Sequence, residues 1–186
     1  MVPVMSLWIP IFVSAVLVFI VSSIIHMMLP WHRGDVKELP SEDAVMEALR
    51  RANVTPGDYV TPYCSSMKAM KDPAFIEKRN KGPIAFMTIV KGGPPTMGSS
   101  LLLWFLYSCL VGVFAAYLTG RALGPGAPYL AVFRFAGAAA FMCYSMGLLQ
   151  NSIWYKRNWT ATIKTMIDGL VYGLVTAGAF GWLWPR

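Results

Sequence analysis

Charged side chains are scarce in this chain: they make up 13% of its 186 residues, whereas 56% are hydrophobic. A soluble domain carries roughly 25% charged residues, so this composition excludes an ordinary water-exposed globular surface. The length fits a single folding unit. We therefore expect a membrane protein whose helices pack against lipid and against one another.

Cysteine is also scarce, and its spacing excludes the usual sulfur sites. Cys64, Cys109 and Cys143 include no CxxC pair, so the sequence predicts neither a disulfide framework nor a zinc site. No Ser/His/Asp set, phosphate-binding glycine loop or pair of carboxylates stands out in the sequence. Cys64 is the one candidate for a reactive thiol, and a structural role is the simpler interpretation.

Only two histidines, His26 and His32, are available for acid–base or metal chemistry. They are six residues apart with Pro30 between them, so one continuous helix would not present both side chains together. No third histidine exists to supply a ligand from another helix. We expect no catalytic residue, no metal site and no cofactor in this chain.

Long apolar runs bordered by tryptophan are what the sequence does contain. The seven tryptophans lie at or just beyond the ends of four runs: Trp8, Trp31, Trp104, Trp154, Trp159, Trp182 and Trp184. The runs are Leu7–Leu29, Leu101–Gly120, Pro128–Gln150 and Thr165–Trp184. Indole rings settle where hydrocarbon meets headgroups, and about 20 apolar residues cross a bilayer. The sequence predicts an all-α membrane protein with four transmembrane helices.

The first run predicts an N-terminal transmembrane anchor helix, residues 1–29. It lacks a preceding basic segment and is longer than the apolar core of a cleavable signal peptide, so we expect it to be retained. An extramembrane, cytoplasmic-side segment with short helices follows over residues 30–100. Residues 101–186 form a predicted three-helix transmembrane unit.

Positive charge predicts the orientation. If the N-terminus faces outward, segment 30–100 and the loop between the third and fourth runs lie inside and carry thirteen Lys and Arg residues. Only Arg121 and Arg186 then lie outside, while Arg134 falls within a run. Because Lys- and Arg-rich loops stay in the cytoplasm, the sequence predicts that both termini lie outside.

The net charge of +7 does not indicate nucleic-acid binding. Ten of the sixteen Lys and Arg residues lie between positions 31 and 100, mixed with eight of the nine acids. That segment is therefore nearly balanced and shows no basic stripe of the kind that binds phosphates.

Two short helices are predicted within segment 30–100. Ser41 is a candidate N-cap for the first, because two acids follow it and apolar residues recur at helical spacing from Val45. The second is predicted from Asp72-Pro73 to Gly82. The following run, Pro83–Val90, fits a strand or an interfacial segment, and its periodicity does not decide between them.

Several short motifs give the chain a resemblance. They are Met67-Lys68, Asp72-Pro73, Glu77-Lys78, Gly82-Pro83, Met87-Thr88, Gly93-Pro94-Pro95 and Gln150-Asn151-Ser152-Ile153-Trp154. Together with one anchor helix, this pattern resembles a family of small bacterial four-helix membrane proteins with no assigned function. The resemblance implies a location in the bacterial inner membrane and brings no catalytic or ligand-binding residue.

Small residues recur at every fourth position of two runs. They are Ser108, Gly112, Ala116 and Gly120 in one run and Gly169, Gly173, Ala177 and Gly181 in the other. Helices in lipid gain contact by close backbone approach through such residues. The sequence predicts two helix-packing faces, and leaves open whether each meets its own bundle or another subunit.

Three ionisable residues lie within or near the ends of the runs: His26, Arg134 and Asp168. Such residues are costly in lipid and are candidates for function. At a rise of 1.5 Å per residue, Arg134 and Asp168 differ in depth by about 15 Å, too far for a direct ion pair. His26 lies near Asp168 in depth. The alternatives are a polar site around this pair, or side chains that reach interfacial water or backbone.

The sequence favours a non-catalytic integral-membrane protein that acts as an accessory subunit of a larger complex or assembles with itself. Its expected partners are lipid and other membrane subunits or a second copy, and no nucleic acid. A small transporter or channel with a polar path through His26, Asp168 and Arg134 is the alternative. A lipid-directed enzyme would have only Cys64 and the 30–100 segment to support it.

Overall fold

A computed structural model describes all residues from Met1 to Arg186. Four of its helical segments are long and apolar enough to cross a membrane: Val4–Met28, Gly98–Ala122, Tyr129–Tyr155 and Trp159–Trp182. The prediction of a mostly helical protein with four candidate membrane-spanning helices is confirmed at this level. The chain divides into two compact units, and we describe each by itself.

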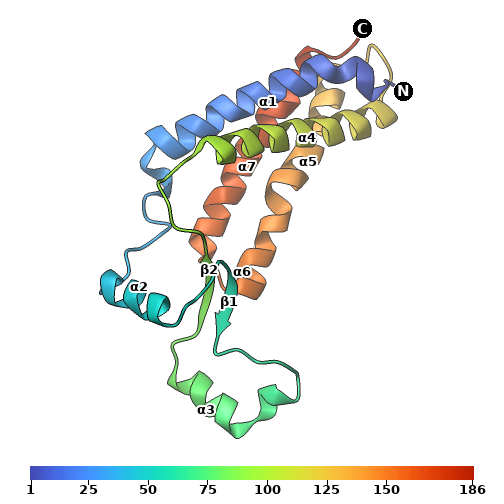
Figure 1. The fold of residues 1–186 in the computed structure, drawn as a ribbon. Helices are drawn as coiled ribbons and strands as arrows, with labels where there is room; N and C mark the ends of the chain where they lie inside the picture. The colour runs from blue at the N-terminus through green and yellow to red at the C-terminus, as the bar shows by residue number, and fades with distance from the viewer. The chain divides into compact units, whose positions relative to one another are not determined.

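The first unit, Met1–Val36 with Thr96–Arg186, is called the bundle here. Its helices are α1 (Trp8–Ser23), α4 (Gly98–Ala122), α5 (Tyr129–Ser145), α6 (Leu149–Tyr155) and α7 (Trp159–Trp182). Helix α4 packs against α1 and α5, and α7 packs against the same two helices (Figure 1). The four long helices therefore form a closed ring that includes the predicted helix of residues 1–29, and α5 and α7 share its most extensive interface.

The N-terminus, the α4–α5 turn and the C-terminus meet at one end of the bundle. The Val2 amide donates to the Gly120 carbonyl at 2.8 Å, and the Gly126 amide donates to the Pro185 carbonyl at 2.9 Å. The Trp184 indole N–H donates to the Gly124 carbonyl at 3.0 Å. The first bond satisfies a carbonyl that the last turn of α4 leaves open, and the other two join the α4–α5 turn to the C-terminal segment.

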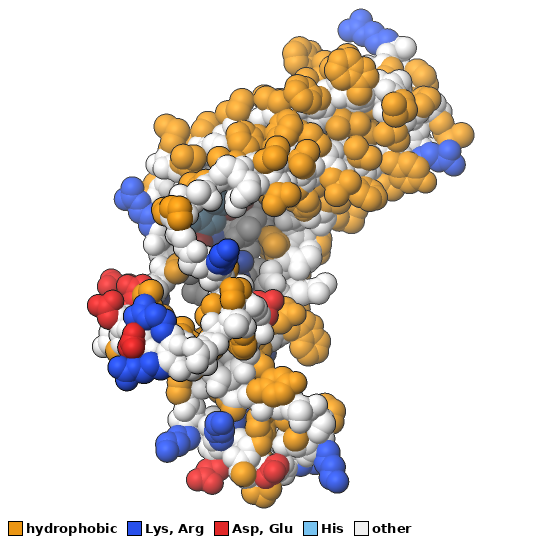
Figure 2. Space-filling view, in the orientation of Figure 1, with side chains coloured by type: hydrophobic (Ala, Val, Ile, Leu, Met, Phe, Trp, Pro, Cys, Tyr) orange, Lys and Arg blue, Asp and Glu red, His pale blue; other side chains and the backbone are white.

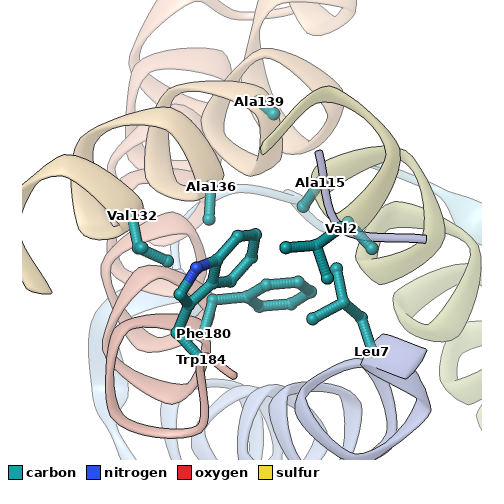
Figure 3. Packing of buried hydrophobic residues seen from close by; sticks show 9 residues of the cluster. Val2, Leu7, Ala115, Val132, Ala136, Ala139, Phe180 and Trp184 are labelled. Atoms are coloured by element: carbon teal, nitrogen blue, oxygen red, sulfur yellow. The ribbon is translucent and has the colours of Figure 1, made fainter. Parts of the chain in front are cut away.

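A hydrophobic cluster fills the bundle near this end. The Phe180 and Trp184 rings lie between α4, α5 and the N-terminal segment, with Val2, Leu7 and Val132 around them (Figure 3). Phe180 is fully buried. A second buried cluster, nearer the other end, includes Val18, Val111, Ala140, Tyr144 and Tyr172.

Glycines on α4 and α7 face neighbouring helices of the same chain. A Cβ added at Gly112 would lie 3.1 Å from Ile11 Cγ2, and one at Gly173 would lie 3.2 Å from the Phe141 amide nitrogen. One at Gly169 would overlap Ser145 Oγ. Ser108, Ala116, Gly120 and Ala177 are buried as well. The small residues thus allow close approach within the bundle.

The second unit, Lys37–Pro95, is called the inserted unit here. It contains α2 (Glu42–Arg51), α3 (Pro73–Lys81), and the strands β1 (Gly57–Thr61) and β2 (Ala85–Ile89). Both predicted short helices are confirmed. Asp72 caps α3, since its carboxylate accepts from the Ala74 amide at 2.9 Å. Ser41 occupies the N-cap position of α2 as predicted, but its backbone is left-handed and its hydroxyl makes no capping hydrogen bond.

The sequence left Pro83–Val90 open as a strand or an interfacial segment. The structure shows a strand there, because β2 pairs with β1 in an antiparallel ladder. Asp58 and Thr88 face each other in this ladder, and the Thr88 hydroxyl donates to the Asp58 carboxylate at 2.6 Å. Pro62 is the only buried residue of the inserted unit. A two-stranded ladder with two short helices therefore stands almost without a core.

Surface chemistry separates the two units. The helices of the bundle present mostly hydrophobic side chains, whereas the inserted unit presents acidic and basic side chains intermixed with hydrophobic ones (Figure 2). Outward-facing side chains of the bundle include Leu103, Leu106, Leu110 and Phe114 on α4, all more than half exposed. Such an apolar belt fits a lipid-facing surface.

Candidate functional site

The chain reverses direction just after α1. A π-helical turn, Ile24–Met28, extends α1, Leu29 is extended, and a short 3-10 turn, Pro30–His32, follows. Pro30 cannot continue a helix and restricts the residue before it to extended conformations. The rings of His26 and His32 consequently stack with centroids 4.6 Å apart and planes 14° from parallel. One continuous helix would not present both imidazoles together, and the break at Leu29 and Pro30 is what brings them together.

His32 lies between two carboxylates. Its Nδ1 is 2.6 Å from Asp35 Oδ2, and its Nε2 is 2.8 Å from Asp168 Oδ2. Both ring nitrogens therefore face a carboxylate oxygen at hydrogen-bond distance. Its side chain is 18% exposed. His32 therefore links the end of the first membrane helix to α7.

Asp168 is the buried acid of the bundle, only 2% exposed. Its Oδ1 accepts from the Trp31 indole N–H at 3.1 Å, and its Oδ2 faces His32. A buried carboxylate is tolerated only when it is paired and hydrogen-bonded. Trp31 and His32 meet that requirement from the same 3-10 turn.

Lys164, one turn before Asp168 on α7, completes the arrangement. Its ammonium donates to Asp35 Oδ1 at 2.9 Å and to the Trp31 carbonyl at 2.8 Å, and it lies 5.5 Å from the centre of the Trp31 ring. The hydrogen bond from Lys164, followed by that from His32, lowers the pKa of Asp35. We call Trp31, His32, Asp35, Lys164 and Asp168 the polar network.

His26 stands at the edge of the polar network. Its Nδ1 is 3.0 Å from the Ser22 carbonyl, an acceptor, so Nδ1 carries the proton and Nε2 keeps a lone pair. One ligand atom each from His26, His32 and Asp168 lies within 4.8 Å of the others. His26 is exposed, and an open hollow lined by Leu29, Pro30, Trp31 and Lys164 lies beside the network.

Arg134 does not join these residues. It is exposed on α5, near the opposite end of the bundle. Gly137 packs on Ala177 of α7, so Arg134 lies about twelve residues of helix, or about 18 Å, from the level of Asp168. Of the three candidates within the runs, the structure brings His26 and Asp168 together and leaves Arg134 apart.

Cys64 also stands apart from the other candidates. It lies in the inserted unit, where its thiol is half-buried and donates to the Ser66 carbonyl at 3.2 Å. The hollow of that unit is lined by Ser66, Lys68, Ala69, Lys71, Asp72 and Pro73, and Cys64 is not among them. This arrangement gives no support to a thiol nucleophile.

The sequence analysis missed four members of the polar network: Trp31, His32, Asp35 and Lys164. Two local signals could have indicated them. Lys164 and Asp168 are four residues apart and share a helix face, and His32 and Asp35 are three residues apart after a proline. The remaining link joins residues 136 positions apart and depends on the chain reversal at Pro30.

Comparison with known proteins adds no identification, because no family model, no curated protein and no solved structure matches this chain. The resemblance to small bacterial membrane proteins therefore stays a prediction. The bundle, the polar network and the inserted unit are what the chain offers as a basis for function.

Proposed function

We propose that this protein is a non-catalytic accessory subunit of the bacterial inner membrane, with its inserted unit on the cytoplasmic side as the docking element. The observation that supports the docking role is the near absence of a core in that unit, where Pro62 alone is buried. A chain segment this poor in buried contacts gains its stability from a partner or remains weakly folded.

Exposed apolar side chains of the inserted unit supply the contacts that docking needs. Tyr63, Met67 and Val90 are between 73% and 79% exposed. Aromatic and methionine side chains are enriched at the centres of protein interfaces. The partner is another membrane subunit or a second copy of this chain.

The small-residue faces do not serve this docking. Gly112 and Gly173 already pack against Ile11 and Phe141 of the same chain. Their replacement by leucine would therefore test the fold of the bundle, and the test of docking belongs in the inserted unit.

A photo-crosslinking amino acid at Tyr63, in cells, tests the proposal. We expect a covalent adduct between this chain and one protein species, identified by mass spectrometry of the excised band. The control places the same amino acid at Leu106, which is 52% exposed on the apolar face of α4, and should give no such band. Lack of any protein adduct from Tyr63 would contradict docking through this unit.

The orientation has its own test. Both termini are proposed to lie outside, because thirteen Lys and Arg residues then lie inside and two outside. Alkaline phosphatase fused to the C-terminus should be active, since it folds only outside the inner membrane, and green fluorescent protein at the same point should stay dark. The reverse pattern would overturn the orientation and move the inserted unit outside.

A small transporter or channel is the second candidate. The polar network with His26, which joins titratable groups within a lipid-facing bundle, favours it. The Tyr172 hydroxyl, one turn beyond Asp168 on α7, is buried without a hydrogen-bond partner and would extend a path from Asp168 toward the level of Arg134. Proton flux into proteoliposomes that Asp168→Asn abolishes and Asp58→Asn preserves would establish this candidate. Equal flux with empty liposomes would exclude it.

A further inference from the structure

We propose that His26, His32 and Asp168 form a binding site for a divalent transition-metal ion, and that Zn²⁺ fits its donors. The three side chains offer two imidazole nitrogens and one carboxylate oxygen, and one such atom from each lies within 4.8 Å of the others. Three ligands of this kind with a fourth position open are characteristic of zinc sites that also bind water or another molecule.

Each candidate histidine ligand has one ring nitrogen held by a hydrogen-bond acceptor. Metal-binding histidines almost always donate their other ring N–H to a carboxylate or a backbone carbonyl. His32 Nδ1 faces Asp35 at 2.6 Å, and His26 Nδ1 faces the Ser22 carbonyl at 3.0 Å. Both Nε2 atoms are thereby left for a metal ion.

Asp168 is oriented in the same manner. The Trp31 indole N–H holds Oδ1 at 3.1 Å, which leaves Oδ2 directed at His32. All three candidate ligands thus have one polar atom fixed by a neighbour and one atom directed into or available to the shared site. If the hydrogen bond between His32 and Asp168 served only to hold the first helix against α7, the hydrogen bond that orients the His26 ring would not be needed.

The distances allow a shared ion after a small movement. Two ligand atoms at 2.0–2.1 Å from a tetrahedral zinc lie about 3.3 Å from each other. His32 Nε2 and Asp168 Oδ2 are 2.8 Å apart, so they would separate by about 0.5 Å. The His26 atom would approach by at most about 1.5 Å. Its ring, which is stacked nearly parallel to that of His32, would also rotate so that its nitrogen lone pair points at the ion, a movement open to an exposed side chain in the middle of a π-helical turn.

The entry of the ion is balanced by the loss of a proton. In the hydrogen-bonded arrangement, His32 Nε2 carries a proton toward Asp168. When the metal binds, that proton leaves to water and the Nε2 lone pair binds the ion, while the Nδ1 proton stays on His32 and remains hydrogen-bonded to Asp35. Two carboxylates, Asp35 and Asp168, then oppose the charges of the ion and of Lys164.

A metal ion can reach the site from solvent, because the exposure of the three side chains increases from Asp168 through His32 to His26. Asp168 is buried, the His32 side chain is 18% exposed, and His26 is exposed. The ion would enter beside His26 and rest against the buried carboxylate. Its open position would face the outside of the bundle, where water or a partner's side chain can complete the coordination.

Zinc affinity measured on the full chain tests the site. The purified chain, from which any histidine tag has been removed, competes with a chromogenic chelator for Zn²⁺ in detergent micelles. We expect one ion per chain, and visible d–d absorption when Co²⁺ replaces Zn²⁺. The chain is measured alone, so the result does not depend on the proposed docking.

Two variants remove a ligand with little other change. His26→Phe keeps a ring stacked on His32, and Asp168→Asn keeps an oxygen to accept from Trp31. Each should lower zinc affinity at least about 100-fold, and Asp35→Asn, which is no ligand itself but bonds His32 Nδ1 and Lys164, about 10–100-fold. The matched control is Asp58→Asn, which removes a carboxylate from the β1–β2 ladder and should bind as the unaltered chain does.

The site is overturned if the unaltered chain binds no more zinc than His26→Phe, or if Asp58→Asn loses as much affinity as Asp168→Asn. Should Asp168→Asn fail to fold, the exposed His26→Phe variant decides alone. Its helical circular dichroism and unfolding temperature should equal those of the unaltered chain. A hydrogen bond between His32 and Asp168 that only holds the first helix against α7, without metal, would leave both the zinc stoichiometry and the Co²⁺ spectrum of His26→Phe unchanged.

Discussion

The bundle and the inserted unit are stabilised by different kinds of interaction. In the bundle, small side chains let helices approach closely, and buried hydroxyls such as those of Ser14 and Ser22 donate to carbonyls of their own helix. In the inserted unit, order rests on the β1–β2 ladder, the Asp72 cap and exposed ion pairs from Glu47 to Arg50 and Arg51. We therefore expect most of the stability to reside in the bundle, because the inserted unit buries almost none of its side chains.

The polar network belongs to the first of these regions. Asp168 would be costly inside a bundle without partners, and its partners come from the 3-10 turn that leads out of the first membrane helix. The polar network is therefore held by the unit that contains the buried clusters, as a preorganised binding site requires.

The largest effect is expected from overfilling the bundle at Gly173. A Cβ there would already lie 3.2–3.3 Å from backbone atoms of α5, so Gly173→Leu must push α5 and α7 apart. We expect a loss of about 3 kcal/mol in the free energy of unfolding, measured by thermal or SDS-induced unfolding in micelles. Gly98→Leu is the control, since nothing lies within 4 Å of its added Cβ. Equal unfolding midpoints for the two variants would remove the basis for the close-packed bundle.

A smaller loss in the free energy of unfolding is expected when one large apolar side chain in each region is replaced by alanine. Phe180 is fully buried in the bundle, whereas Ile84 of the inserted unit is 45% exposed. Phe180→Ala should cost about 2 kcal/mol, mainly through the cavity that it leaves, and Ile84→Ala less than about 0.5 kcal/mol. The same unfolding assay measures both. A comparable loss from Ile84→Ala would mean that the inserted unit has a core of its own and would weaken the docking proposal.

The crossings could be predicted from sequence because hydropathy and tryptophan position are local signals. Asp72-Pro73 likewise carries its own helix start. The ladder between β1 and β2 joins residues about 30 positions apart, and five-residue strands with polar alternation give little warning of it. Ser41 stands at the predicted N-cap position without a capping hydrogen bond from its side chain, because a serine before two acids does not impose the extended backbone that capping needs.

The polar network could be predicted only in part, for a similar reason. Depth along the helices placed His26 near Asp168. The position of His32 depends on how the chain continues where the helix breaks at Leu29 and Pro30. Helical spacing alone carries no information on the direction that follows such a break.

The smallest effect on stability is expected from removing a helix cap, and each region offers one cap for the comparison. Asp72 caps α3, and Asn158 caps α7 through the Thr160 amide at 2.9 Å. The α3 helix has nine residues and none of them is buried, whereas α7 is held by buried residues along its length. Asp72→Ala should remove about 1 kcal/mol from α3 and speed amide exchange about fivefold over residues 73–81. Exchange in the centre of α7 should not change in Asn158→Ala, because packing replaces what the cap loses.

The global unfolding midpoint separates this local effect from a shared one. If the two regions fold independently, Asp72→Ala leaves the midpoint of the bundle unchanged while α3 frays. A midpoint that falls with the loss of this cap would show that the inserted unit and the bundle unfold together, and the contrast in burial between them would then say little about where stability resides. Because exchange and midpoint are measured on the same sample, one variant decides whether the two regions are separate in energy as well as in structure.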